Sequence, residues 1–129
     1  MVLVYVALGG AAGSVLRYVI GGAVQRSLHA GFPYGTLFVN VAGCLLIGIL
    51  ISTFMNLEPP AYLRGLLVVG FCGGFTTFSA FSNETVGLLQ AGAYARAATY
   101  LFLTLLLCLL ATIAGMSAVR AIGFGVHGR

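Results

Sequence analysis

Several polar and aromatic side chains lie inside long apolar stretches, where they could bind a small ion. Asn40 is the clearest case, because an unpaired amide in hydrocarbon costs several kcal/mol and must find a partner. That partner is either another helix or an ion in a pore. Phe75, Phe78 and Phe81 recur at every third position and therefore share a helical face. Aromatic rings have a positive edge, so these phenyl groups could solvate a small anion beside an amide N–H, or could simply form a packing or lipid-facing stripe.

Two charged residues also fall inside apolar stretches. Arg17 either belongs to an ion path or serves a structural purpose, by snorkelling to the interface or pairing with a neighbour. Glu84 is a functional candidate by default, since acids inside a membrane are rare. Its alternative role is an ion pair or hydrogen bond at a helix end.

The last apolar stretch carries polar side chains at every fourth position, namely Tyr100, Thr104, Cys108 and Thr112. They share one face of a helix, which is either interhelical contact or part of a conduction path. The three cysteines, Cys44, Cys72 and Cys108, have no CxxC spacing and are interpreted as small core residues, not as a disulfide framework or metal site. No nucleotide, zinc or nucleophile motif occurs, so we expect no enzyme.

The elements that must position these residues are membrane-spanning helices. The chain has 129 residues, of which 60% are hydrophobic and 6% charged, and its mean hydropathy of +1.10 excludes a soluble domain. A span needs roughly 20 apolar residues, so we expect an all-α integral membrane protein with one domain over 1–129. The predicted spans are 2–24, 35–55, 61–90 and 96–119. We expect no removable signal peptide.

The third predicted span has an unusual composition, because Gly70, Gly73 and Gly74 are followed at once by threonines and serines. Adjacent glycines each disfavour a helix by roughly 1 kcal/mol. We therefore predict a break at 73–77, near the middle of the membrane. In the first span, Gly9 and Gly13 form a small-xxx-small pair that favours close helix packing.

The arginines give almost no orientation signal. Arg64, Arg120 and Arg129 would lie on one side of the membrane, and Arg26 and Arg96 on the other. Insertion in both orientations, and hence an antiparallel dimer, is a hypothesis that follows. The net charge of +4 is scattered along the chain, which does not indicate nucleic-acid binding.

Three segments together resemble the Fluc family of microbial fluoride channels, also called CrcB: GGAAGSVLRY (9–18), GTLFVNVAG (35–43) and GFCGGFTTFSAFSNE (70–84). The resemblance covers nearly the whole chain, and its third motif is specific. It implies an antiparallel, dual-topology homodimer with two pores that exports fluoride passively across the inner (cytoplasmic) membrane.

The resemblance also implies roles for individual residues. Asn40 would donate to fluoride, Phe78 and Phe81 would contact it with their ring edges, and the backbone carbonyls of Gly73 and Thr76 from both subunits would hold one structural Na⁺ at the dimer interface. Arg17 is similar to a basic residue near the pore entrance. The polar path beside the rings would contain Ser79, Glu84, Tyr100, Thr104 and Thr112. The chain departs from the family at Ala80 and Cys108, where hydroxyl residues are common.

Two other function classes remain. A small proton-coupled transporter of the four-helix multidrug type would need an acid in its substrate chamber, and Glu84 is the only candidate. An accessory membrane subunit predicts that changes at Asn40 or Phe81 affect only folding.

Overall fold

The computed structural model describes residues 1–28 and 31–123, and all regular structure within them is helical. Four helical stretches are long and apolar enough to cross a membrane: Val2–Leu28, Tyr34–Leu57, Ala61–Gln90 and Tyr94–Gly123. The predicted all-α class with four spans is confirmed at this level. The chain is a multi-pass membrane protein.

Helices α1 (Val2–Leu28), α2 (Tyr34–Leu57) and α6 (Tyr94–Gly123) extend beyond the predicted spans. Hydropathy marks only the apolar part of a helix, whereas the helical backbone continues until a residue stops it. The stop after α2 is Glu58, which adopts a left-handed φ of 46° directly before Pro59 and Pro60.

The third stretch is divided into shorter elements. It contains α3 (Ala61–Arg64), the π-helix η1 (Gly65–Cys72), α4 (Gly73–Phe75) and α5 (Phe78–Gln90). Thr76 and Thr77 have extended backbone between α4 and α5, whereas Gly73 and Gly74 are helical. The non-helical backbone is therefore narrower than the predicted segment 73–77.

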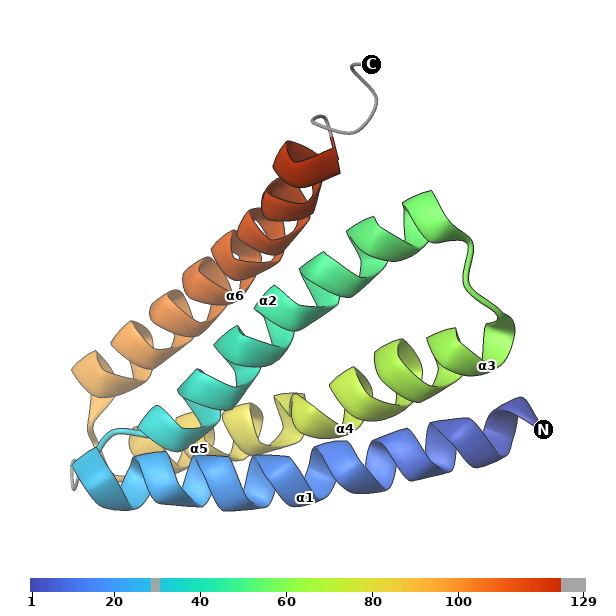
Figure 1. The fold of residues 1–129 in the computed structure, drawn as a ribbon. Coiled ribbons are helices and arrows are strands. Elements are labelled where there is room, and N and C mark those ends of the chain that lie inside the picture. Colours follow the sequence, from blue (N-terminus) through green and yellow to red (C-terminus); the bar gives the residue numbers. More distant parts are fainter. Residues whose placement is uncertain (29–30, 124–129) are drawn as a thin grey trace.

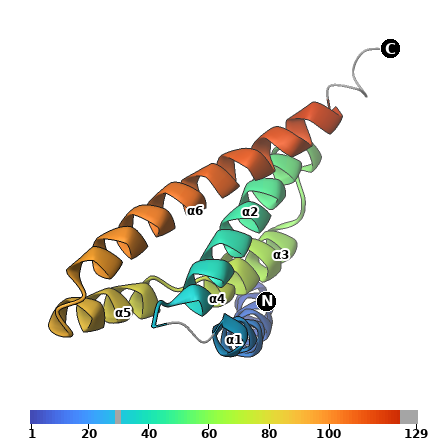
Figure 2. The same ribbon diagram turned by 90° about the vertical axis from the view of Figure 1, so that its left-hand side faces the viewer.

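The helices pack as two pairs. In Figures 1 and 2, α1 lies along the stretch from α3 to α4, and α2 lies along α6. Both contacts depend on glycine: a Cβ on Gly9 or Gly13 would meet the η1 carbonyls of Leu66 or Phe71, and one on Gly48 would meet the backbone of Thr112. Small residues allow such close backbone approach, which drives helix association in lipid. The packing role predicted for Gly9 and Gly13 is confirmed.

Candidate functional site

The extended residue Thr77 is held by the side chain of Asn40 on α2. Asn40 Nδ2 donates to the Thr77 carbonyl at 3.1 Å, and the Thr77 N–H donates to Asn40 Oδ1 at 2.7 Å. The amide is buried, with 7% of its surface exposed. Of the two partners that the sequence left open for Asn40, the interhelical hydrogen bond is present, and the second N–H of the amide is left over for another acceptor.

Asn40 also lines a cavity of about 470 Å³, here called the central cavity. Its walls come from α2, η1, α4, the extended residues Thr76 and Thr77, α5 and α6. Among the predicted site residues, it brings together Asn40, Gly73, Thr76, Phe78, Phe81 and Thr104. An amide, a threonine and two aromatic rings thus line one space, and amide N–H groups and ring edges are partners suited to a small anion.

The two phenylalanines differ in their surroundings. Phe81 is 4% exposed and packs edge-on against Tyr100, with ring centroids 5.1 Å apart, whereas Phe78 is 75% exposed. Their own centroids are 5.5 Å apart and their planes tilted by 54°. Phe81 is therefore positioned by its own chain, while Phe78 presents its ring outward.

Thr104, which lines the central cavity, has a buried hydroxyl without a hydrogen-bond partner among the described residues. Its residue is 6% exposed, and its Oγ1 is the one buried side-chain polar atom that lacks a hydrogen-bond partner in the described part of the chain. A buried unsatisfied hydroxyl costs about 1–3 kcal/mol. Thr104 Oγ1 therefore lacks, within the described chain, the partner that buried hydroxyls ordinarily have, at a residue that lines the cavity.

The carbonyl oxygens of Gly73 and Thr76 lose their helical donors at the extended residues. In a continuous helix the N–H of Thr77 would bond to Gly73 and that of Ala80 to Thr76. The first instead donates to Asn40, and the second donates to Thr77 Oγ1 at 3.1 Å. Gly73 is exposed, and a Cβ placed on it would have nothing within 4 Å. Two carbonyls that have lost their helical donors, one of them in an exposed residue, fit a hard cation that prefers oxygen ligands.

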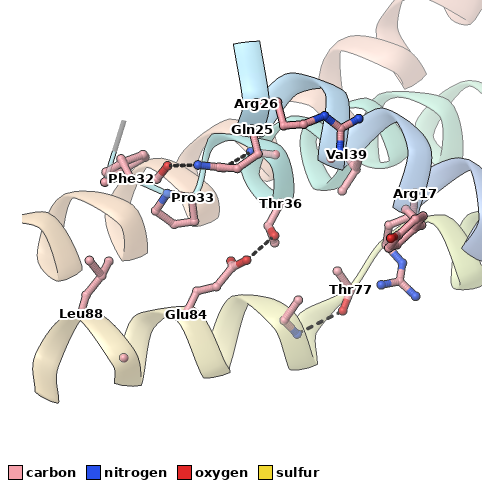
Figure 3. A pocket seen from close by; sticks show the side chains of 17 residues that line it. Arg17, Gln25, Arg26, Phe32, Pro33, Thr36, Val39, Thr77, Glu84 and Leu88 are labelled. Carbon is pink, nitrogen blue, oxygen red and sulfur yellow. Dashed lines mark hydrogen bonds between the residues drawn. The ribbon is translucent and has the colours of Figure 1, made fainter. Parts of the chain in front are cut away.

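A second cavity, of about 610 Å³, lies on the other side of Thr77, which lines both; we call it the outer cavity. Figure 3 shows Glu84 of α5 pointing into it toward Thr36 of α2. Thr36 Oγ1 donates to Glu84 Oε1, and the Tyr100 hydroxyl donates to Oε2, both at 2.6 Å. Both carboxyl oxygens of Glu84 accept a hydrogen bond, so the side chain is held between α2 and α6.

Arg17 of α1 also lines the outer cavity (Figure 3). Its Nε donates to the Gly74 carbonyl at 3.0 Å, next to the extended residues. The side chain is therefore tied to the third stretch by a structural hydrogen bond, while the rest of its guanidinium brings positive charge to the cavity wall.

Ser79 and Thr112 line neither cavity. Ser79 is exposed and shares a hydrogen bond of 3.2 Å with Thr77 Oγ1. Thr112 Oγ1 lies 3.2 Å from the Cys44 carbonyl and 3.1 Å from that of Cys108, so it joins α6 to α2. Within one chain, the stripe on α6 thus has a packing residue at Thr112 and a cavity residue at Thr104.

Thr36 and Thr77 are partners in the site that are not among the predicted site residues. Thr36 lies four residues before Asn40 and so occupies the same face of α2, a spacing that could have identified it. Thr77 contacts Asn40 through its backbone N–H and carbonyl, and the type of a side chain does not predict such backbone contacts.

Residues 4–116 match the family described as CrcB-like protein, Camphor Resistance (CrcB). The chain is 48% identical over 118 residues to the "Fluoride-specific ion channel FluC" of Nitrobacter winogradskyi, covering 91% of this chain and 94% of the relative. It is 50% identical over 110 residues to the protein of that name from Thermus thermophilus, covering 85% and 87%. The Flavobacterium psychrophilum protein of that name is 46% identical over 114 residues, covering 87% and 91%. This chain belongs to the CrcB family.

Proposed function

We propose that this protein is a fluoride channel that lets the ion leave the cell passively. The observation that carries the proposal is the central cavity, where Asn40, Phe81 and the unpartnered Thr104 hydroxyl meet. Fluoride is small and strongly hydrated, so a pore must replace water with fixed donors that a larger anion cannot approach as closely. The fluoride channels named above as relatives match this chain over most of its length, which supports the same ion here.

The ion path runs through both cavities. Thr77 borders each of them, so an anion that leaves the central cavity passes the Asn40–Thr77 pair and reaches the outer cavity. Arg17 attracts the anion there, and Glu84 fixes Tyr100 and Thr36 by accepting from their hydroxyls. Ser79, which is exposed in one chain, joins the polar path once a second subunit is present, and Thr112 supports that path by holding α6 against α2.

The functional unit is an antiparallel homodimer in the inner membrane. Phe78 supports this, because a ring that is 75% exposed in one chain needs a partner before it can form a closed ion path. The nearly balanced arginines allow both orientations. The interruption at Thr76 and Thr77 then lies at mid-membrane, where irregular backbone is tolerated if it is covered by protein.

The carbonyls of Gly73 and Thr76 would hold a structural Na⁺ at the dimer interface. When bound, the cation supplies positive potential that offsets the cost of placing an anion in a low-dielectric interior. The chain's own contribution is to keep both carbonyls free, which it does by directing the Thr77 and Ala80 N–H groups to side chains.

The test is anion efflux from liposomes containing purified protein, followed with a fluoride electrode and repeated with a chloride electrode. We expect fast fluoride release, no chloride release and no requirement for a proton gradient. Chemical cross-linking of the same preparation reports the dimer. Protein-free liposomes are the control, and absence of fluoride release from a folded dimer would refute the proposal.

A further inference from the structure

A second arginine, Arg26, lines the outer cavity and has no part in the ion path described above. It belongs to the last turn of α1. Arg17 lies nine residues earlier, where its Nε donates to the Gly74 carbonyl beside the extended residues (Figure 3). Nine residues of helix span about 13 Å. The two arginines therefore join the wall of one cavity at different depths.

The guanidinium of Arg26 lies along α1 because Gly22 leaves room for it. A Cβ placed on Gly22 would be 3.1 Å from Arg26 Nη1. Tyr18 lies one turn further back, and residues four apart share a helical face. All three residues line the outer cavity. The positive charge of Arg26 is thus directed back over the preceding turn of α1, toward the cavity wall.

The lining of the outer cavity has an excess of positive charge. Its charged residues in the described part of the chain are Arg17, Arg26 and Glu84. Even with Glu84 ionised, two positive charges and one negative charge leave a net charge of +1. Glu84 accepts hydrogen bonds from Thr36 and Tyr100. Arg26 is exposed, so its charge acts on ions through the water at the mouth of the cavity.

We propose that Arg26 recruits small anions to the mouth of the outer cavity and so raises their local concentration before they reach Arg17. Clefts lined by one sign of charge concentrate ions of the opposite sign, and the effect falls steeply with ionic strength. Attraction by one exposed charge does not distinguish fluoride from other small anions, so selection is left to the central cavity. The gain in fluoride flux rests on the proposed channel function, whereas anion accumulation does not.

Anion accumulation can be measured with a tryptophan reporter, because the chain contains no tryptophan. Tyr18→Trp places the reporter on the same wall as Arg26 in the purified full-length protein, and iodide quenches its fluorescence by collision. In this background, Arg26→Gln should lower the iodide Stern–Volmer constant about 1.5- to 2-fold at low ionic strength, the effect of one unit charge about 10 Å away in water. The difference should disappear at about 1 M salt, where the Debye length is about 3 Å.

Three controls separate attraction from access. Acrylamide is an uncharged quencher and should act equally on all variants. Arg26→Lys keeps the charge and should keep native iodide quenching. Arg120→Gln removes an exposed arginine in the last turn of α6 that lines neither cavity, and should also have no effect. Equal iodide quenching with and without Arg26, a parallel fall in acrylamide quenching, or the same loss in Arg26→Lys would overturn the proposal.

Fluoride efflux from liposomes of a zwitterionic lipid tests the consequence for conduction. At low ionic strength, efflux through Arg26→Gln should be about 1.5- to 2-fold slower than through the native protein or Arg120→Gln, and the three should converge at about 1 M salt. Unchanged efflux at every ionic strength would contradict a recruiting role in conduction. If the native protein conducts no fluoride, the proposed function fails, and iodide quenching still decides whether Arg26 concentrates anions.

Discussion

The side chain of Asn40 pairs with the backbone of Thr77 through two hydrogen bonds that run in opposite directions. The side-chain amide of Asn40, on α2, thus takes the place of the backbone partners that Thr77 would have in a continuous helix. The same amide lines the central cavity. Structural support and the proposed anion contact therefore fall on one group, and substitutions must be chosen to separate them.

Asn40→Asp tests the donor. The carboxylate can still accept from the Thr77 N–H, but it removes the N–H donor and adds negative charge to an anion path. We expect fluoride flux to fall about tenfold or more, equivalent to ~1.4 kcal/mol on the barrier, in a dimer that still forms. Ser52→Ala, which removes a 3.4 Å bond to Met116 elsewhere on α2, is the control. Native flux through Asn40→Asp would exclude a pore role for the amide, and loss of flux only with loss of the dimer would favour an accessory subunit.

Phe78→Ile and Phe81→Ile test the ring edges. Both should lower fluoride flux, because an aliphatic side chain has no positive ring edge. Only Phe81→Ile should also lower the free energy of unfolding, by about 1–3 kcal/mol, since Phe81 is buried against Tyr100 while Phe78 is exposed in the single chain. Phe102→Ile, at an exposed position on α6, is the control. Normal efflux in both site variants would refute the ring-edge argument.

Thr104→Val separates function from stability. Valine has the shape of threonine without the hydroxyl, and that hydroxyl has no partner within the chain. Thermal unfolding in detergent should show unchanged or higher stability, while fluoride efflux falls about tenfold. The matched control is Thr85→Val. This change removes a hydroxyl that donates to the Phe81 carbonyl within the same helix at 2.8 Å. A clearly destabilised Thr104→Val protein would mean that the hydroxyl has a structural partner.

Glu84→Gln distinguishes a channel from a proton-coupled transporter. The amide oxygen can still accept from Thr36 or Tyr100, so the outer cavity keeps much of its geometry. We expect partial fluoride flux that does not respond to a pH gradient, measured in liposomes with and without such a gradient. Complete loss of a flux that follows the proton gradient in the native protein would favour the transporter.

Gly13→Ala tests the α1–η1 contact. The new Cβ would meet the Phe71 carbonyl and lie 2.8 Å from the Phe75 amide nitrogen, so the helices must separate. We expect a loss of about 1–3 kcal/mol of stability. Gly10→Ala is the control on the same helix, because its nearest neighbour, the Gly70 carbonyl, lies at 3.9 Å. Equal melting temperatures for the two variants would show that α1 and η1 tolerate a wider separation.

The sequence predicts the four spans well, because hydropathy over a window depends only on local composition. It also identifies Asn40 as a residue that must be paired. It cannot identify Thr77 as the partner, since the two are 37 residues apart and the contact uses backbone groups.

Local propensity fails at Gly74. The adjacent glycines predict unwinding, yet Gly74 is helical and its missing Cβ makes room for the Gly10 carbonyl of α1. Tertiary packing overrides helix propensity here. The extended backbone falls instead at Thr76 and Thr77, where Asn40 and the Thr77 side chain supply the replacement hydrogen bonds.

The chain order of the Asn40–Thr77 pair bears on biosynthesis. A ribosome makes α2 before the third stretch, so Asn40 is synthesised 37 residues ahead of Thr77. When Thr77 enters the bilayer, its replacement partner is already part of the preceding helix, so this pair of hydrogen bonds does not depend on α6 or on a second subunit. The third span therefore enters the membrane when the helix that carries the hydrogen-bond partner of Thr77 has already been inserted.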